Sequence, residues 1–332
     1  MASMSAPVLS IVIPVYNEAE SLPELVRRVT ETVRRIEPSF EILFINDGSR
    51  DETIEALRRL CVHDARLRAI SFSRNFGKEI AIAAGLDHAR GQAVVIMDAD
   101  LQHPPEAIAD FMEKWREGYA NVYGVRRDRA IESPVKRAFA RGFYRMFASF
   151  GDTTLPKGAG DFRLLDRKAV DAMKALGERA RFSKGLYSWI GFKSIGVPFD
   201  VAERAHGSTK WSFRKLLRFA LDGLTSFSTA PLRVWTYVGL FVSFCAFIAA
   251  IRFIIEALVY GVTTPGFPTL IVSVMFFSGI QLMSLGILGE YIGRIFAEVK
   301  RRPLYIVEER IGDDGAPEAV TRDERSANDG LL

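Results

Sequence analysis

Two aspartates separated by a single residue, Asp98 and Asp100, form a pair that could hold a divalent cation. They follow an apolar run at residues 94–97, and Gln102 adds another side-chain oxygen two residues later. Hard oxygen ligands of this kind suit Mg²⁺ or Mn²⁺ when phosphate oxygens complete the coordination. A lone Asp-x-Asp is also common in solvated turns. The interpretation as a metal site therefore depends on the rest of the chain.

The elements that must position this pair are predicted to be strands alternating with helices. Apolar runs typical of buried strands occur at residues 9–15, 40–45, 67–72, 94–97 and 120–125. Helices are predicted to begin near Ser21, Thr53 and Pro105. This alternation indicates an α/β domain whose mostly parallel sheet is covered by helices on both faces.

Charged residues follow each of the five predicted strands. They are Glu18, Asp47, Arg74, Asp98, Asp100 and Arg126. Because the carboxyl ends of parallel strands share one edge of a sheet, we expect these residues to converge where open α/β sheets bind ligands. Each residue alone is explained by the polarity of loops, and Asn-Asp-Gly-Ser after the second strand is an ordinary turn. Their joint occurrence favours a ligand site.

The common nucleotide-binding signatures are missing from the sequence. No Gly-x-Gly-x-x-Gly follows the first strand, and no Gly-x-x-x-x-Gly-Lys-Ser/Thr occurs anywhere. Dinucleotide oxidoreductases and P-loop NTPases are therefore disfavoured. A carboxylate at Asp47 that could accept a base or ribose hydrogen bond, a cation site at Asp98 and Asp100, and several arginines fit a nucleoside diphosphate instead.

Apolar residues are concentrated after Pro231. The chain of 332 residues is 48% hydrophobic, and residues 234–251 and 266–289 carry no charge. Each run is long enough to cross a bilayer, and this length disfavours the alternative of core helices in a soluble protein. Basic residues flank both runs on the same side, so the positive-inside rule predicts a multi-pass inner (plasma) membrane protein with both termini cytoplasmic. Cys61 and Cys245 suggest no disulfide, which favours a reducing compartment.

Five motifs resemble, in order and spacing, the inverting glycosyltransferases of family 2. They are Pro14-Val15-Tyr16-Asn17-Glu18, Asn46-Asp47-Gly48-Ser49, residues 73–79 (SRNFGKE), residues 98–104 (DADLQHP) and residues 158–166 (GAGDFRLLD). More narrowly, the chain resembles the polyprenyl-phosphate glycosyltransferases, a group that includes bactoprenol glucosyltransferases and dolichol-phosphate mannose synthase. The resemblance covers about residues 9–308. Asn46 stands where relatives can have a second aspartate, but Asp47 is retained.

The resemblance implies a GT-A catalytic domain, with a role for each matching residue. The nucleotide sugar would contact Pro14, Tyr16, Glu18, Asp47, Lys78, Asp98, Ala99, Asp100, Arg204 and Lys210. Mg²⁺ or Mn²⁺ would be held by Asp98, Asp100 and Gln102, and would neutralise charge on the leaving diphosphate. Arg204 and Lys210 match a segment that closes over the donor phosphates, although a solvated basic loop is the alternative.

Asp161 and Asp100 are the predicted catalytic residues. Asp161 could orient the acceptor or act as a general base. A phosphate acceptor is already ionised near neutral pH, so orientation is favoured over proton abstraction. The acceptor phosphate is expected to bind Arg126, Arg127, Ser133 and Arg137, the last of which belongs to a basic, aromatic segment that is either an ordinary surface helix or a lipid-facing one.

These features divide the chain into five predicted regions. They are a GT-A domain at 1–208, interfacial amphipathic helices at 209–232, transmembrane helices at 233–260 and 266–291, and a partly disordered cytoplasmic segment at 292–332. The catalytic domain is expected to face the cytoplasm. We expect the membrane and a polyprenyl phosphate lipid as partners, with no nucleic acid, and homo-oligomerisation stays open.

The predicted reaction transfers a hexose to undecaprenyl phosphate with inversion, and glucose from UDP-glucose is the favoured donor. Two alternatives are a family 2 enzyme that acts on a glycan acceptor and a non-catalytic membrane scaffold that binds a sugar nucleotide. Processive synthases carry Gln-x-x-Arg-Trp, which does not occur here, and the intact acidic pair argues against a non-catalytic role. Neither the sugar nor the nucleobase is decided by the sequence.

Overall fold

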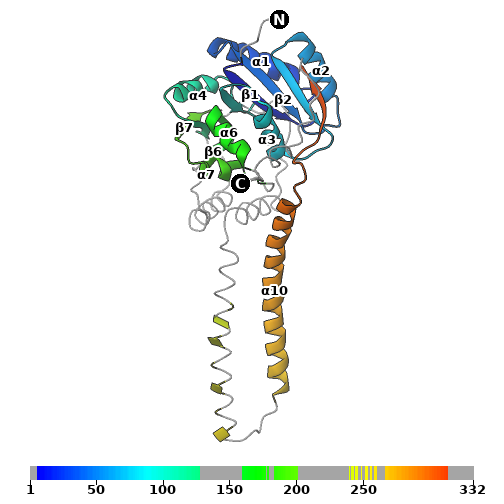
Figure 1. Ribbon diagram of the computed structural model, residues 1–332, viewed down its shortest axis with the longest axis vertical. Helices are drawn as coiled ribbons and strands as arrows, with labels where there is room; N and C mark the ends of the chain where they lie inside the picture. Colours follow the sequence, from blue (N-terminus) through cyan, green and yellow to red (C-terminus); the bar gives the residue numbers. More distant parts are fainter. Residues whose placement is uncertain are drawn as a thin grey trace, which may run out of the picture.

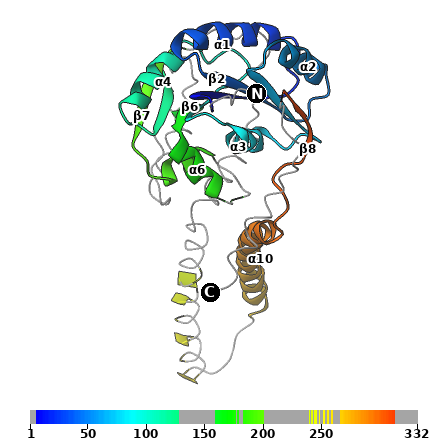
Figure 2. The same cartoon turned by 45° about the horizontal axis from the view of Figure 1, so that its top comes forward.

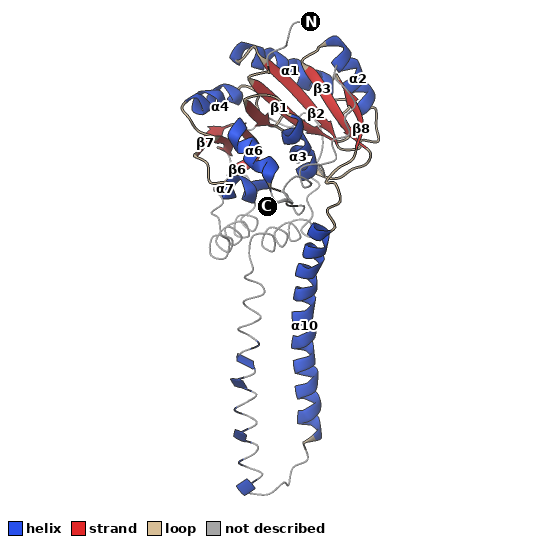
Figure 3. Ribbon diagram, in the orientation of Figure 1, coloured by secondary structure: helices blue, strands red, loops and turns tan. Residues whose placement is uncertain are grey.

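The computed structural model describes residues 6–127, 159–176, 178, 183–200 and 266–312, together with isolated residues between 239 and 259. Its strands form one eight-stranded sheet in the order β7-β5-β6-β4-β1-β2-β3-β8 (Figures 1 and 3). The strands are β1 (Leu9–Val15), β2 (Phe40–Asn46), β3 (Leu67–Phe72), β4 (Ala93–Ile96), β5 (Asn121–Arg126), β6 (Ala159–Asp166), β7 (Ser194–Phe199) and β8 (Val307–Ile311). The predicted α/β class is confirmed, and all five predicted strands are present.

The sheet is parallel at its centre and mixed toward its edges. Strands β4, β1, β2 and β3 are parallel neighbours. Strand β6 runs antiparallel between β4 and β5, and β8 runs antiparallel beside β3. Strands β6, β7 and β8 were not predicted from the sequence. Strand β6 matters most, because it brings Asp161 beside the end of β4.

Helices cover both faces of the sheet, as Figure 2 shows. On one side lie α1 (Leu22–Ile36), α2 (Thr53–His63) and α4 (Ala107–Arg116), and on the other lie α3 (Lys78–His88), α6 (Arg167–Ala175) and α7 (Ser183–Trp189). A hydrophobic core lies on each face of the sheet, and alternate side chains of β1 point into one or the other. Ile11 and Ile13 pack on the α1 side, and Val12 packs on the α3 side. A strand buried on both faces is apolar throughout, which explains why β1 and β2 were recognisable as continuous apolar runs.

The C-terminal part of the chain returns to the sheet. Helix α10 (Phe267–Val299) extends away from the domain, and its C-terminal end lies nearest to it (Figure 1). The chain then passes through Tyr305, whose ring stacks on Phe72 with centroids 5.0 Å apart, into β8. Glu309 of β8 forms an ion pair with Arg58, at 2.6 Å between the closest atoms. These residues belong to the predicted C-terminal segment at 292–332, in which no strand was expected.

Among the helices of the described residues, none has both the length and the apolar composition needed to cross a membrane. The predicted interfacial helices at 209–232 lie outside the described residues, as does most of the predicted span at 233–260. The five region boundaries and the two spans stay predictions.

Candidate active site

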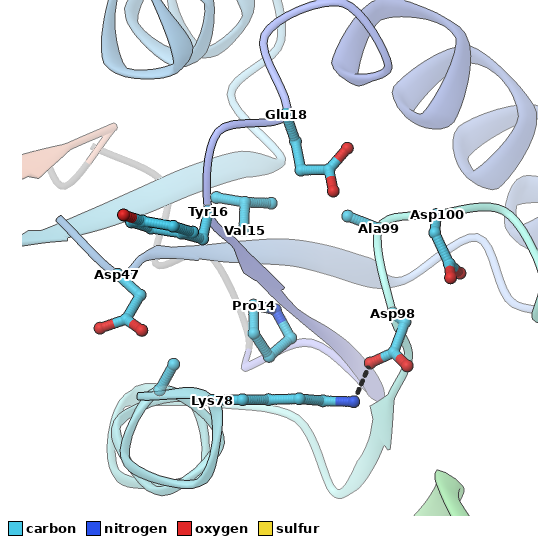
Figure 4. A pocket seen from close by; sticks show the side chains of 10 residues that line it. Pro14, Val15, Tyr16, Glu18, Asp47, Lys78, Asp98, Ala99 and Asp100 are labelled. Carbon is cyan, nitrogen blue, oxygen red and sulfur yellow. Dashed lines mark ion pairs between the residues drawn. The ribbon is translucent and has the colours of Figure 1, made fainter. Parts of the chain in front are cut away.

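A cavity of about 250 Å³ opens at the carboxyl ends of β1, β2 and β4 (Figure 4). It is lined by Pro14, Val15, Tyr16, Glu18, Asp47, Lys78, Ala81, Asp98, Ala99 and Asp100. Eight of these ten residues are predicted donor-binding residues. Val15 and Ala81 were not predicted, because apolar residues at such positions carry no chemical signal. The structure thus gathers the predicted donor residues of the described ranges around one cavity, while their individual roles stay predictions.

The loops after β1 and β2 are held to each other by hydrogen bonds. The backbone N–H of Asn17 donates to Ser49 Oγ at 2.9 Å, and Arg50 N–H donates to Asn17 Oδ1 at 2.9 Å. Asn17 has a φ of 56°, a left-handed conformation that asparagine tolerates better than most residues. A Cβ on Gly48 would lie 2.3 Å from the carbonyl carbon of Arg74, so only glycine allows this close approach. These contacts place Tyr16 and Glu18 at the rim of the cavity.

Asp47 fixes the start of α3. Its carboxylate accepts hydrogen bonds from the backbone N–H of Phe76 at 2.7 Å and of Gly77 at 2.9 Å. Burial raises the pKa of Asp47, and these two amides partly oppose the effect. Lys78, the first residue of α3, is thereby aimed along the floor of the cavity. The structure gives a reason for Asn46, which stands where relatives can have an aspartate. The side-chain amide of Asn46 donates to Ser71 Oγ, and its oxygen accepts from the Ser49 N–H.

Lys78 joins the acidic pair to the predicted catalytic aspartate. Its Nζ lies 2.6 Å from Asp98 Oδ1 and 3.1 Å from Asp161 Oδ2. Burial alone would lower the pKa of Lys78, but the two carboxylates outweigh it and raise the pKa well above the ordinary value. The ammonium group therefore stays charged between the donor residues and Asp161.

Asp161 is held in its ionised form. Burial would raise the pKa of this carboxyl, but Lys184 and Lys78 dominate and lower it well below its usual range. Lys184 Nζ lies 3.9 Å from Asp161 Oδ1, and within the described ranges this oxygen is buried without a hydrogen-bond donor. The neighbouring Glu79 behaves in the opposite way, since burial and the negative charge of Asp161 raise its pKa. Lys184 was not predicted as a site residue, because no predicted element places it near Asp161.

The acidic pair fits a cation that is shared with a phosphate ligand. Asp98 and Asp100 both line the cavity, whereas Gln102 is not among the lining residues and donates its backbone N–H to Asp100 Oδ1 at 3.1 Å. No group of three or more His, Cys, Asp or Glu in the described ranges could form an all-protein metal cage. Mg²⁺ is commonly bound by one or two carboxylates together with substrate phosphates. Two carboxylates on one wall of the cavity meet that requirement.

The two predicted acceptor residues that the structure describes, Arg126 and Arg127, do not line the cavity. Arg126 and Arg127 are exposed at the end of β5, and Arg127 pairs with Asp200 at 3.3 Å. Arg74 lies at the same edge of the sheet but turns over the ring of Phe76, 4.0 Å from its centroid. The remaining predicted residues, Ser133, Arg137, Arg204 and Lys210, lie outside the described residues.

Comparison with known proteins places the chain in a family. Residues 10–173 match the profile of glycosyl transferase family 2, and residues 230–295 match the GtrB C-terminal hairpin. The SfII prophage-derived bactoprenol glucosyl transferase of Shigella flexneri is 45% identical over 300 residues, which cover 90% of this chain and 97% of that protein. The chain belongs to glycosyl transferase family 2.

Other relatives of this family 2 enzyme extend the comparison. An uncharacterized glycosyltransferase of Synechocystis is 46% identical over 309 residues, covering 93% of this chain and 97% of that protein. Among solved structures, the mannosyltransferase of Pyrobaculum calidifontis in complex with GDP-Man and Mn²⁺ is 17% identical, covers 89% of this chain and 88% of that chain, and has a TM-score of 0.46. The resemblance drawn from the five motifs is confirmed, and the protein is a glycosyltransferase with the GT-A fold.

Proposed function

We propose that this family 2 glycosyltransferase transfers glucose from UDP-glucose to undecaprenyl phosphate, with inversion at the anomeric carbon. Similarity to a bactoprenol glucosyl transferase over nearly the whole chain supports the sugar and the lipid acceptor. The observation in the structure that carries the proposal is the ion-paired series Asp98, Lys78 and Asp161. This series connects the acidic pair, which is the proposed cation site, to a buried, ionised carboxylate, and this arrangement suits a transfer between two phosphate-bearing substrates.

The cavity has two chemically different ends, which suits a nucleoside diphosphate. Tyr16 and Asp47 lie at one end, and Asp98 and Asp100 lie at the other (Figure 4). A base or ribose would bind beside the aromatic ring and the Asp47 carboxylate, while the diphosphate would reach Lys78 and the acidic pair. Bound Mg²⁺ or Mn²⁺ would neutralise the diphosphate as it leaves.

The proposed reaction exchanges one carbon–oxygen bond for another. An oxygen of the lipid phosphate attacks the anomeric carbon from the face opposite the nucleotide, and the bond from that carbon to the diphosphate breaks with its electron pair leaving on UDP. Lys78 stabilises the negative charge that grows on the diphosphate. Asp161 pairs with Lys78 and Lys184 and keeps both ammonium groups charged and in place, so we assign it a role in orientation rather than in proton abstraction.

We further propose that the C-terminal hairpin anchors the enzyme in a membrane, with the catalytic domain on the cytoplasmic side. Large apolar side chains of α10 are exposed at closely spaced positions, including Leu282, Met283 and Leu285. These positions lie on more than one face of the helix, so an apolar surrounding is needed to cover them. The match of residues 230–295 to the GtrB C-terminal hairpin supports a hairpin in this part of the chain.

The test is sugar transfer by the purified, full-length enzyme in detergent. Undecaprenyl phosphate, Mg²⁺ or Mn²⁺ and a panel of labelled UDP- and GDP-sugars are supplied, and label extracted into organic solvent is counted. We expect label from UDP-glucose that requires the metal and disappears in Asp100→Asn. Asp110→Asn, which removes an exposed carboxylate on α4, should retain full activity. Label from another donor would change the sugar, and donor binding without any lipid labelling would contradict the lipid acceptor.

A further inference from the structure

The loop that carries the acidic pair begins where β4 stops pairing with its neighbour. The backbone N–H of Met97 still donates to Val12 of β1, at 3.1 Å. The next N–H, that of Asp98, leaves the sheet and donates instead to the imidazole Nδ1 of His103, at 3.0 Å. A buried backbone N–H without an acceptor is costly, so His103 replaces the partner that the sheet no longer supplies.

The imidazole ring is itself fixed by aromatic packing. His103 is 4% exposed, and its ring stacks on Phe162 with centroids 4.7 Å apart and an interplanar angle of 8°. Phe199 meets the same ring edge-on, at 6.0 Å. Phe162 follows Asp161 in β6, so the ring that holds Asp98 rests on the strand that carries the predicted catalytic carboxylate.

The loop between Asp98 and His103 contains a strained residue and therefore needs the contacts of His103 to hold it in place. Leu101 adopts a φ of 58°, which costs about 1–2 kcal/mol for a residue other than glycine. Its side chain is nonetheless buried in the core on the α1 side of the sheet. The second constraint on the loop is the hydrogen bond from the Gln102 N–H to Asp100 Oδ1. Strained backbone persists only where the surroundings over-determine it.

We propose that His103 is a positioning residue for donor binding: its Nδ1 accepts the Asp98 N–H and so holds the Asp98 carboxylate at Lys78 and at the diphosphate end of the cavity. The part of this inference that concerns the donor rests on the proposed function. The part that concerns the loop rests on the hydrogen bond alone.

Three variants separate the hydrogen bond from the packing. His103→Asn keeps an acceptor, because its Oδ1 is the same number of bonds from the backbone as the imidazole Nδ1, but it loses the ring. His103→Phe keeps a ring against Phe162 and loses the acceptor. His103→Leu matches asparagine in shape and also lacks the acceptor. If His103→Phe does not fold, the comparison of Asn with Leu still decides the question.

The first measurement is hydrogen–deuterium exchange of peptides that cover residues 97–103 in the full-length protein in detergent. We expect the Asp98 amide to exchange about fivefold faster in His103→Phe and His103→Leu, and to keep most of its protection in His103→Asn. The proposal would be overturned if the Asp98 amide were as protected in His103→Phe as in the wild type. It would also be overturned if His103→Asn and His103→Leu lost protection of that amide equally. This readout needs no nucleotide, so it does not depend on the donor being UDP-glucose.

The second measurement is steady-state transfer with separate variation of the two substrates. Loss of the acceptor atom should raise the KM for the nucleotide sugar about tenfold while the KM for the lipid phosphate changes little, because small displacements at a reacting site are costly. His103→Asn, which keeps the acceptor atom, should have a KM for the nucleotide sugar close to that of the wild type. A general loss of stability would instead lower the amount of active enzyme and leave both KM values unchanged, and that result would contradict a positioning role.

Discussion

The two ends of the central strands both carry charged clusters, but the clusters are built in opposite ways. At the amino ends, Glu41 and Arg68 form an ion pair at 2.8 Å, with side chains only 7% and 6% exposed. The other Glu41 oxygen accepts from Ser10 Oγ at 2.6 Å and from the Arg90 N–H at 2.7 Å. Ser10 Oγ in turn accepts from the Gly91 N–H. Both carboxylate oxygens of Glu41 are thus engaged within the protein.

At the carboxyl ends the charges are only partly satisfied. Lys78 is 43% exposed and is shared between Asp98 and Asp161. Asp161 Oδ1 is buried without a hydrogen-bond donor within the described ranges, and Lys78, which pairs with the other oxygen of Asp161, lines the cavity. A fully satisfied network fixes a structure, whereas charges held ready without complete partners can be completed by a ligand. This difference is the one that we expect between a structural cluster and the proposed active site.

The largest expected effect is on stability, at the amino ends. Glu41→Ala removes the carboxylate that pairs with the buried Arg68 guanidinium, and should lower the free energy of unfolding by about 3–5 kcal/mol. Denaturant unfolding measures this value. The matched control is Glu309→Ala, which breaks the exposed pair with Arg58 and should cost less than about 1 kcal/mol. Similar losses in both variants would show that burial does not distinguish the two pairs. Glu41→Ala that still folds should keep the wild-type donor KM.

Next in size is the effect of Asp98→Asn on transfer. Removing one charge from the acidic pair should lower the transfer rate by about 10²- to 10³-fold, the usual cost of losing a group that stabilises transition-state charge. Because Asp98 is partly exposed, the free energy of unfolding should change by less than about 1 kcal/mol. Rate assays and denaturant unfolding on the same preparations test both values. A large stability loss with an unchanged rate would reverse the roles of the two ends.

A smaller effect is expected for Lys78→Met on metal binding. Lys78 pairs with the Asp98 carboxylate in the free enzyme and so competes with a cation for it. Removal of the ammonium group should therefore increase the affinity for Mn²⁺ in the absence of nucleotide by about three- to tenfold. Titration of Mn²⁺ by electron paramagnetic resonance measures this. Lys184→Met is the control, because Lys184 pairs with Asp161 and not with Asp98 in the described structure. Unchanged Mn²⁺ affinity in Lys78→Met would mean that the cation does not bind at Asp98.

The sequence predicted the carboxyl-end site better than the amino-end cluster. Ligand-binding residues follow strands directly, so Glu18, Asp47, Asp98 and Asp100 could be found from local patterns alone. Glu41 and Arg68 lie inside apolar strands, where nothing in the order of residues shows that they meet. Their contact depends on the parallel pairing of β2 and β3. The same dependence on tertiary structure hid Lys184 and His103.

The edges of the sheet were missed for a related reason. Strand β6 is predictable only as the motif around Asp161, because its antiparallel place between β4 and β5 follows from long-range pairing. Strand β8 consists of Val307, charged residues and Ile311, a composition that carries little strand signal. It is ordered by pairing with β3 and by the contact between Glu309 and Arg58. Local propensity could not reveal either strand.

The smallest expected effect concerns pH and distinguishes the two roles considered for Asp161. Because Lys184 and Lys78 lower the pKa of Asp161, its carboxylate is ionised at every pH above its ordinary value of about 3.9. The stability that this ionised group contributes is present above about pH 3.9 and is lost only as the pH falls below it. Protonation of Asp161 therefore cannot produce a change in rate between about pH 5 and about pH 9. The acid limb that we expect, near about pH 6, comes from the second ionisation of a phosphate monoester such as the acceptor. That limb should persist in the residual activity of Asp161→Asn, measured over the same pH range. A limb that disappears in this variant would show that Asp161 takes up a proton during transfer, and would make it a general base.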